Sequence, residues 1–254
     1  MASVDNVVNA SPVHEERFFL TAGESNARGE MPMTLIAERM IEVATGHANI
    51  LGIGYATLSP LGVGWVLSRL GVELKRVPKI NEYYSLRTWI ESWNRLFSER
   101  CFEFFDGEGN SIGFGRTIWA TIDINTRRAS DLTRFATSAT IANDVVCGMP
   151  RLRNHGAFEP TLTEELTFRF ADLDFNRHVN SVKYIEHILN LWPLEHYDKF
   201  RIDRFDIAYR HECLAGQKVV LAADTGEDGI CHVDIIRNDE RVVSSSLHFT
   251  EDPV

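Results

Sequence analysis

Cysteine is scarce in this sequence, and the four cysteines present lie far apart. No Cys-x-x-Cys pair occurs, so the pattern excludes both a zinc knuckle and a disulfide-dense secreted scaffold. We therefore expect free thiols and a reducing compartment. The cysteines are Cys101, Cys147, Cys213 and Cys231.

Positive charge is also in short supply. Lys and Arg together number 26 against 36 Asp and Glu, which gives a formal net charge of -10. The whole surface of so acidic a chain is not expected to attract nucleic acid or anionic membrane. We therefore expect no nucleic-acid partner, and an acidic protein partner would need a local basic patch.

Long uninterrupted hydrophobic runs are missing as well. Residues 50–67 carry no charge, but Gly and Pro break this stretch repeatedly, so it predicts a buried turn and strand and no membrane span. Its Gly52-x-Gly54 lacks a third glycine in register, which argues against a nucleotide-binding loop. The first six residues lack a basic region followed by an apolar run, so we expect neither a secretory signal nor a transit peptide. A cytoplasmic bacterial protein fits this pattern.

Periodicity divides the rest of the chain into two similar halves. Each half has a strand, then a helix with apolar residues at helical spacing (near 35–43 and 182–191), then several β-rich segments. A helix followed by an antiparallel meander buries its apolar stripe by lying across the sheet. The sequence therefore predicts an α+β fold of two tandem units, each with a central helix packed on an antiparallel sheet. The expected boundaries are 1–128 for the first unit, 129–160 for a connector and 161–254 for the second unit.

The densest group of chemically useful side chains lies just before the second helix, at Asp174, Asn176 and His178. A carboxylate can activate water or attack a carbonyl directly, while an amide and an imidazole can donate hydrogen bonds to an oxyanion. Asn180 or Ser181 can cap the helix, whose first amide groups would then face the same pocket. The alternative is a polar turn in which the Asp and Asn side chains only cap and the His packs.

This segment resembles the signature of the plant and bacterial acyl-acyl-carrier-protein (acyl-ACP) thioesterases, in which Asp-x-Asn-x-His-Val-Asn precedes the central helix of a hotdog fold. All five named residues are present at 174–180. The resemblance implies two tandem hotdog repeats and hydrolysis of fatty acyl-ACP to free fatty acid and holo-ACP. It extends over about residues 15–250, through Trp65–Arg69, Thr88 with Trp89, Trp119, 125–128 and Tyr209–Cys213.

Carried over residue by residue, the resemblance makes Asp174, Asn176, His178 and Glu212 the catalytic group. Cys213 matches a position once proposed as a nucleophile, but we expect its thiol to be a bystander because the other groups already supply a base and oxyanion donors. Two mechanisms stay open. Either a carboxylate takes a proton from the attacking water, or Asp174 attacks the thioester and Glu212 activates water against the resulting anhydride.

Other polar residues give weaker signals. His187 and His196 lack metal-ligand spacing, so we expect no metal and no cofactor. Asp172 would point away from Asp174 if the segment were extended, which predicts a surface or supporting charge. The tryptophans are expected in the core, with one or two able to line an acyl tunnel.

The first half shows no matching catalytic set. Its helix offers His47 and Asn49 near its end, without a preceding aspartate. We therefore expect one active site per pair of repeats, with the first repeat shaping an acyl pocket lined by Ile36, Met40 and the glycine-rich passage after them.

The resemblance implies acyl carrier protein as the partner, and an acidic carrier would dock on basic clusters. A carrier and coenzyme A share a phosphopantetheine arm, so an acyl-CoA thioesterase of the same fold stays an alternative. A hotdog dehydratase and a non-catalytic acyl-binding protein are further alternatives, and the oligomeric state, a monomer of fused repeats or a homodimer, stays open. The candidate docking clusters are Arg127 with Arg128, Arg151 with Arg153, and Lys199 with Arg201 and Arg204.

Overall fold

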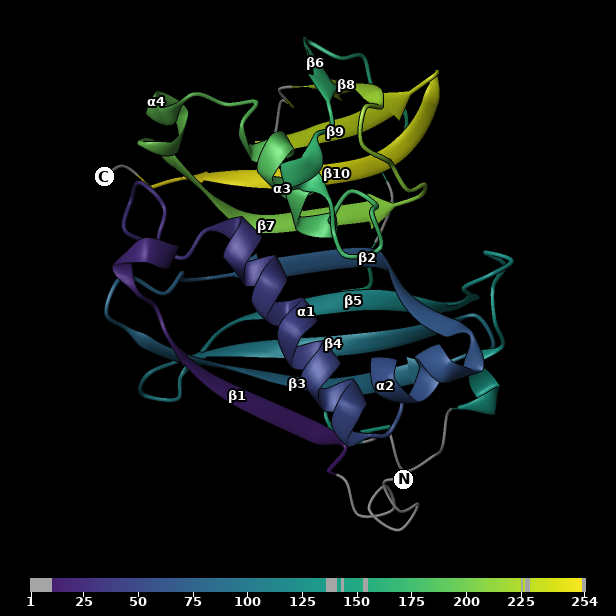
Figure 1. Ribbon diagram of the computed structural model, residues 1–254. Coiled ribbons are helices and arrows are strands. Elements are labelled where there is room, and N and C mark those ends of the chain that lie inside the picture. Colours follow the sequence, from purple (N-terminus) through teal and green to yellow (C-terminus); the bar gives the residue numbers. More distant parts are fainter. Residues whose placement is uncertain are drawn as a thin grey trace.

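The computed structural model describes residues 11–252 apart from 136–140, 143, 153–154, 225 and 227–228. Its first half contains a long helix, α1 (Met33–Ile50), a short helix, α2 (Tyr55–Leu58), and five strands (Figure 1). The strands are β1 (Val13–Phe19), β2 (Val63–Leu74), β3 (Tyr83–Trp93), β4 (Phe97–Asp106) and β5 (Ser111–Asp123).

The second half repeats this order with shorter elements. Its helices are α3 (Ser181–Leu189) and α4 (Leu194–Tyr197). Single 3-10 turns occur in both halves and at the start of the connector, at Ala22–Glu24, Ser59–Leu61, Leu132–Arg134 and Phe170–Asp172. The strands are β6 (Leu162–Thr167), β7 (Phe200–Tyr209), β8 (Lys218–Ala223), β9 (Ile230–Arg237) and β10 (Glu240–Glu251).

All ten strands form one antiparallel sheet in the order β1-β3-β4-β5-β2-β7-β10-β9-β8-β6. The order within the first half is repeated in reverse in the second, so β2 and β7 correspond and pair with each other at the junction. Their register runs from Arg69 opposite Ala208 to Glu73 opposite Arg204. The two halves are thus related by an approximate two-fold axis, as in a symmetric dimer with an isologous interface.

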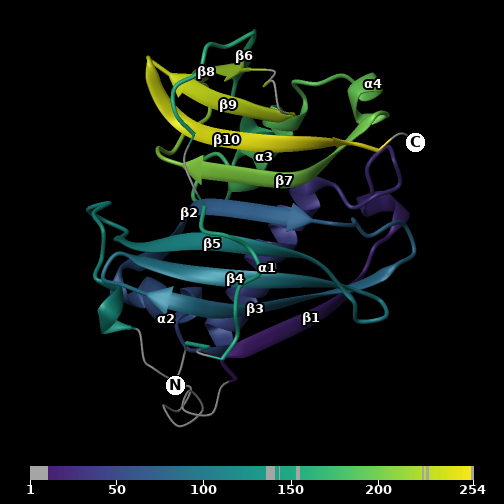
Figure 2. The same ribbon diagram turned by 180° about the vertical axis from the view of Figure 1, so that it is seen from behind.

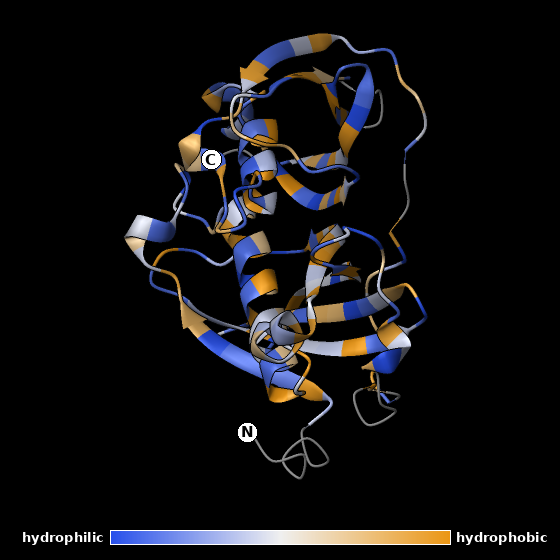
Figure 3. Cartoon of the chain, turned by 45° about the vertical axis from the view of Figure 1, so that its right-hand side comes forward, coloured by the Kyte–Doolittle hydropathy of each residue, from blue (hydrophilic) through white to orange (hydrophobic). Residues whose placement is uncertain are grey.

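Both long helices lie on the same face of the sheet and contact each other (Figure 1). Hydrophobic and polar residues alternate along much of the sheet (Figure 3), so the strands between the two edge strands direct apolar side chains toward the helices. Each large side chain buried there contributes about 1.5–3 kcal/mol relative to an exposed position. The core under the helices includes Leu70, Val72, Phe102, Phe104, Ile185 and Ile188.

The helix α1 ends in a left-handed turn at Gly52, whose φ is 71°. The amide of Ile53 then bonds to the carbonyl of Ala48 at 2.9 Å, which closes a Schellman-type cap. The expected turn and strand over 50–67 are present, but α2 lies between them and was not predicted. Among the described residues, no helix has the length and apolar character needed to cross a membrane.

The connector runs over the opposite face of the sheet (Figure 2). It pairs with β3 through a bridge between Ile90 and Ile141. Further along, the guanidinium of Arg116 donates to the carbonyl of Met149 at 3.1 Å. The connector therefore covers the outer face of the sheet. The inner face, on which the helices pack, is the face that can hold a site.

Candidate active site

Asp174 closes the loop that leads into α3. Its Oδ1 accepts hydrogen bonds from the amides of Asn176 at 2.8 Å and His178 at 3.1 Å. Arg177 adopts a left-handed conformation, φ 65°, which is rare for a residue other than glycine and is often found at functional sites. The polar-turn alternative is therefore partly right, because one oxygen of Asp174 organises the backbone, while Oδ2 has no hydrogen-bond partner among the described residues.

A short antiparallel contact brings the chain after β7 to this loop. The amide of Val179 donates to the carbonyl of Cys213 at 2.9 Å, and His178 bridges Leu214. The neighbouring Glu212 consequently lies beside His178, with Oε2 3.5 Å from Nε2. The separation is that of an ion pair when the imidazole is protonated, and proton transfer would need a closer approach, to about 2.6–3.2 Å, or one bridging water.

Glu212 also has a partner from the other repeat, Arg127, whose guanidinium forms an ion pair with its second carboxylate oxygen. Arg127 lies in the turn after β5, where its φ is 58° and its amide bonds to the carbonyl of Asp123 at 2.8 Å. Because the pair crosses from one repeat to the other, sequence reasoning missed this contact and assigned Arg127 to docking. The signal that could have found it is the pairing of β2 with both β5 and β7, which brings the ends of β5 and β7 together and which no local pattern displays.

The structure brings the four predicted residues to one cleft of about 380 Å³. The second repeat supplies Asp174, Asn176, His178 and Glu212, while the first repeat supplies the opposite wall. The side chain of Asn176 is exposed and has no hydrogen-bond partner among the described residues. First-repeat residues in the wall include Tyr55, Trp65, Leu67, Ile122, Ile124 and Arg127.

A second cavity of about 470 Å³ adjoins the cleft and is mostly apolar. The two hollows share Tyr55, Gly64, Trp65 and Phe175 as walls. The rings of Tyr55 and Phe175 meet edge to face at this junction, with centroids 5.9 Å apart. An apolar hollow next to a few convergent polar groups is the usual form of a site for an alkyl chain with a reactive head.

Two of the predicted lining residues are wrong. Ile36 lines a different cavity, close to Arg28, and Met40 is fully buried in the core. The face of α1 that meets the apolar cavity is turned further round the helix and lies nearer its C-terminal end. It consists of Ile41, Ala44, Thr45 and Ala48, and the glycine-rich passage contributes Gly54 and Gly64 as expected.

The start of α3 is less available to a ligand than the sequence suggested. Asn180 is the cap, and its Oδ1 accepts from the amide of Val182 at 3.0 Å. Its backbone carbonyl accepts from the amide of Lys183 at 2.9 Å. Two of the first amide groups are therefore already satisfied, which leaves the side chains as the main polar groups of the cleft.

Cys213 lies beneath the site. Its side chain is fully buried in the core and does not line the cleft. Burial raises the pKa of this thiol, although Tyr184 and Arg237 act in the other direction. A buried thiol of raised pKa is a poor nucleophile.

Of the two expectations for Asp172, the surface position is wrong, and the contacts of its carboxylate are those of a supporting charge. The segment Phe170–Asp172 is a 3-10 turn, so the alternation of an extended strand does not apply, and Asp172 is buried. Its carboxylate bonds to Nε2 of His187 at 2.9 Å and accepts from the amide of Arg169 at 2.6 Å. His196 packs against the ring of Phe249, and burial lowers the pKa of its imidazole.

One group in the described part of the chain has the spacing of a metal site. Glu91, Cys101 and Cys147 lie together on the outer face, under the connector. Glu91 is already ion-paired with Arg116, and none of the three lines the cleft that holds Asp174, His178 and Glu212. The group therefore has no part in the chemistry of the cleft.

The counterpart of the loop 174–178 in the first repeat is the loop 26–30, which leads into α1. The amide of Asn26 bonds to the carbonyl of Glu30 at 2.8 Å, and Oδ1 of Asn26 accepts from the amides of Arg28 and Glu30 at 2.9 and 3.1 Å. Gly29 takes the left-handed position, φ 71°. Every one of these features has its equivalent in the loop 174–178.

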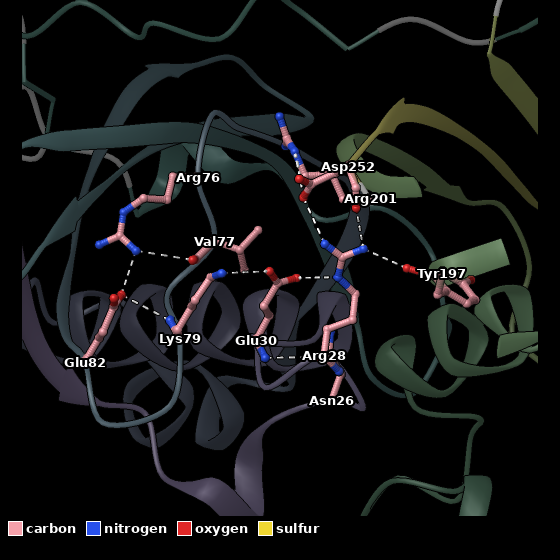
Figure 4. A network of polar contacts seen from close by, with 10 residues as sticks. All are labelled: Asn26, Arg28, Glu30, Arg76, Val77, Lys79, Glu82, Tyr197, Arg201 and Asp252. Atoms are coloured by element: carbon pink, nitrogen blue, oxygen red, sulfur yellow. Dashed lines mark hydrogen bonds and ion pairs between the residues drawn. The ribbon is translucent and has the colours of Figure 1, made fainter. Parts of the chain in front are cut away.

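The side chains of this counterpart form a closed ionic network (Figure 4). Arg28 bonds to Glu30 at 3.2 Å, to the carboxylate of Asp252 at 3.0 Å and to the carbonyl of Tyr197 at 2.7 Å. Lys79 lies 3.7 Å from the other oxygen of Glu30. Through Arg28, the loop 26–30 thus joins the first repeat to Tyr197 and Asp252 of the second repeat. His47 and Asn49 lie at the opposite end of α1 from this loop.

The candidate docking clusters differ in whether their side chains are held in ion pairs. Arg201 and Arg204 are held in ion pairs with Asp252 and with Glu73 and Asp206. Arg151 is exposed and Arg153 lies outside the described residues. Among the candidate groups, Arg128 is exposed next to the cleft, with no ion pair to a described residue.

The fold consists of a helix packed on a five-stranded antiparallel sheet, and this unit occurs twice, with the two sheets joined edge to edge. A polar loop precedes the second helix. These features define the double hotdog class of thioesterase-like proteins. Two family models match the chain: the acyl-ACP thioesterase N-terminal domain over residues 11–137 and the C-terminal domain over 157–251. The chain belongs to the acyl-ACP thioesterase family.

Solved structures agree with this assignment. An acyl-ACP thioesterase from Bacteroides thetaiotaomicron is 33% identical with a TM-score of 0.86, covering 94% of this chain and 98% of that one. The 12:0-ACP thioesterase from Umbellularia californica is 19% identical with a TM-score of 0.80, covering 95% and 98%, and supports the fold alone. The predicted α+β double hotdog is confirmed.

A curated plant relative, oleoyl-acyl carrier protein thioesterase 2 of Arabidopsis thaliana, is 28% identical over 79% of this chain and 59% of its own length. The chain spans 57% to 65% of the length of this relative and the two that follow it in similarity.

Proposed function

We propose that this protein hydrolyses fatty acyl-ACP to free fatty acid and holo-ACP. The observation that carries the proposal is the meeting of Glu212 and His178 at 3.5 Å in a cleft that adjoins an apolar cavity. A thioester carbonyl in the cleft would have its alkyl chain in the cavity. Family membership and the names of the relatives, which include oleoyl- and palmitoyl-ACP thioesterases, support the same activity.

In the proposed mechanism, Glu212 takes a proton from water as the oxygen attacks the thioester carbon. Asn176 and His178 donate hydrogen bonds to the oxyanion, and collapse of the intermediate breaks the carbon–sulfur bond and returns the proton to the leaving thiolate. Glu212 suits the base because both oxygens of its exposed carboxylate reach the cleft between Arg127 and His178. Asp174 is the second carboxylate of the cleft: its Oδ1 holds the loop, and its charged Oδ2 accepts a hydrogen bond from the attacking water in this route or attacks the thioester carbon itself in the second route.

The first repeat would then shape the alkyl pocket and the second would carry the chemistry. We also propose that the carrier docks beside the cleft, where Arg128, Arg177 and Arg210 are exposed on an otherwise acidic protein. Complementary charge mainly accelerates encounter. The cytoplasmic location and the oligomeric state stay predictions.

The test is release of thiol from matched acyl-ACP and acyl-CoA substrates, followed with a thiol-reactive dye. We expect a higher kcat/KM for acyl-ACP. Charge reversal at Arg128 should raise KM for acyl-ACP and leave a small acyl thioester almost unaffected, because that substrate lacks the carrier surface. A preference for acyl-CoA at equal chain length would favour the acyl-CoA thioesterase alternative, and the absence of any thiol release would reject hydrolysis.

A further inference from the structure

A buried arginine forms part of the floor of the apolar cavity. Arg100 lies on β4, is 4% exposed and lines the cavity together with Ser98, two residues before it on the same face of the strand. It does not line the catalytic cleft. On the corresponding strand β9 of the second repeat, the buried side chains of this face are apolar, namely Cys231, Val233 and Ile235, and its arginine, Arg237, lies at the end of the strand, where it donates to the carbonyl of Glu212.

The charge of Arg100 has no counter-charge among the described residues. Its Nη1 donates to Nδ1 of His47 at 2.8 Å and to the hydroxyl of Thr88 at 3.3 Å. Burial and the neighbouring charge of Arg100 lower the pKa of His47 to about 4, so this imidazole is a neutral acceptor at physiological pH. The buried Arg116 on the next strand differs, because Glu91 and Glu99 neutralise it.

Several hydrogen-bond donors of Arg100 are left over. A guanidinium has five N–H donors, and the two bonds to His47 and Thr88 leave three. Burying a cation whose N–H donors lack acceptors costs several kcal/mol of free energy. A methyl-ended chain packed against Arg100 would supply no acceptor and would therefore bind poorly there. A bound oxygen acceptor would relieve that cost.

The other polar groups of the cavity are already satisfied or neutral. Trp65 donates its ring N–H to the carbonyl of Ile53 at 2.8 Å, and the hydroxyl of Thr45 donates to the carbonyl of Ile41 at 2.8 Å. Arg100 is the one charged residue among the described residues that line this cavity. The hydroxyl-bearing ring of Tyr55 lies at the junction with the cleft, so specific polar recognition away from that junction falls to Arg100, with Ser98 beside it.

We propose that Arg100 binds an oxygen acceptor on the distal part of the acyl chain, so that the substrates of this protein include acyl thioesters with a hydroxyl, keto or carboxylate group far from the thioester. The proposal rests on the proposed function, because it places the thioester at His178 and Glu212 and the chain in the adjoining cavity. The shared chemistry is acceptance of a hydrogen bond from the guanidinium.

The test compares acyl-pantetheine thioesters of equal chain length that end in a methyl, a hydroxyl or a carboxylate. We expect wild-type kcat/KM to favour one of the oxygenated chains over the methyl-ended chain, and Arg100→Met to reduce that ratio about 10- to 100-fold, the usual effect of losing a hydrogen bond to a charged group. The matched control is Thr45→Val, which removes a hydroxyl already bonded within α1 and should leave the ratio unchanged. A hydroxyl preference identifies neutral oxygenated chains, and a carboxylate preference identifies dicarboxylic chains.

A wild-type enzyme that prefers the methyl-ended chain would overturn the proposal, and this result needs no variant to fold. If folded Arg100→Met lost activity equally toward the methyl-, hydroxyl- and carboxylate-ended chains, the proposal would also be overturned, because Arg100 would then be a structural residue. Binding of acyl-pantetheine analogues with a methylene in place of the sulfur gives a readout without hydrolysis. Tighter binding of the oxygenated analogue without turnover of any thioester would reject the proposed hydrolysis and keep the site.

Discussion

The loops 26–30 and 174–178 have the same backbone and different side chains. Both are closed by a side-chain oxygen at their first residue, Asn26 or Asp174, and both place their fourth residue in the left-handed region. One loop presents His178 to Glu212, whereas the other ties Arg28 into ion pairs. The comparison teaches that the turn is a feature of the fold, and that function depends on which side chains it carries.

The largest expected effect is the loss of activity on changing the loop 174–178 or its neighbour Glu212. Glu212→Gln and His178→Ala should each lower kcat by about 10²- to 10⁴-fold, because a proton acceptor or an oxyanion donor is lost. Asn176→Ala should lie at the lower end of this range. Steady-state hydrolysis of an acyl thioester, with circular dichroism to verify folding, measures the change. Folded variants with near-normal kcat would remove these residues from the catalytic group.

The reverse experiment changes the first loop. Arg28→Met should lower the free energy of unfolding by about 2 kcal/mol, because the hydrogen bonds of Arg28 to Glu30, Asp252 and the carbonyl of Tyr197 are lost while Lys79 and Arg201 still accompany the two carboxylates. Denaturant titration measures the loss, and kcat of the folded variant should stay close to wild type. A large fall in kcat at full folding would mean that this loop also takes part in catalysis.

The cross-repeat pair between Arg127 and Glu212 should have an intermediate effect. Arg127→Gln removes the group that orients the Glu212 carboxylate, so we expect kcat to fall about tenfold with a small acyl thioester, and Arg127→Lys to recover part of it. Free guanidinium added to Arg127→Ala should restore some turnover. If only KM for acyl-ACP changed, Arg127 would be a docking residue, as the sequence first suggested.

The smallest effect concerns the pH dependence of the first repeat. His47 is neutral in the fold with a pKa lowered to about 4, so the unfolded chain, with the ordinary value of 6.5, binds more protons between these values. Stability from this group is therefore present above pH 6.5 and is lost as pH falls toward 4. Between pH 7 and pH 6, wild type should lose about 0.5–1 kcal/mol more than His47→Gln in denaturant titrations. Parallel curves for the two proteins would show that His47 does not titrate in this way.

Sequence reasoning predicted the parts of the structure that depend on local patterns. Helical spacing and β-rich runs indicated the repeated order of helix and strands, and the motif 174–180 indicated which polar side chains lie before α3. Glu212 came from resemblance, since its approach to His178 depends on a backbone contact between Val179 and Cys213 that is remote in sequence.

The missed features depend on contacts between the repeats. Arg127 reaches Glu212 only because β2 and β7 join the two sheets. The loop 26–30 was overlooked because none of its residues is identical to the corresponding residue of 174–178. Asn26 and Gly29 are nevertheless residues that favour such a turn. His47 attracted notice as a histidine, but it lies at the other end of α1.

Asp174→Asn tests the central claim most directly, because Asn26 already closes the same turn with an amide oxygen. The variant keeps the Oδ1 acceptor for the amides of Asn176 and His178 and replaces the charged Oδ2 with a neutral NH2 group, which donates and does not accept. We predict an unfolding free energy close to wild type together with a fall in kcat on the order of 10²-fold or more. A stable Asp174→Asn protein that hydrolyses acyl thioesters at the wild-type rate would contradict the account, because Asp174 would then serve the turn alone, as Asn26 does.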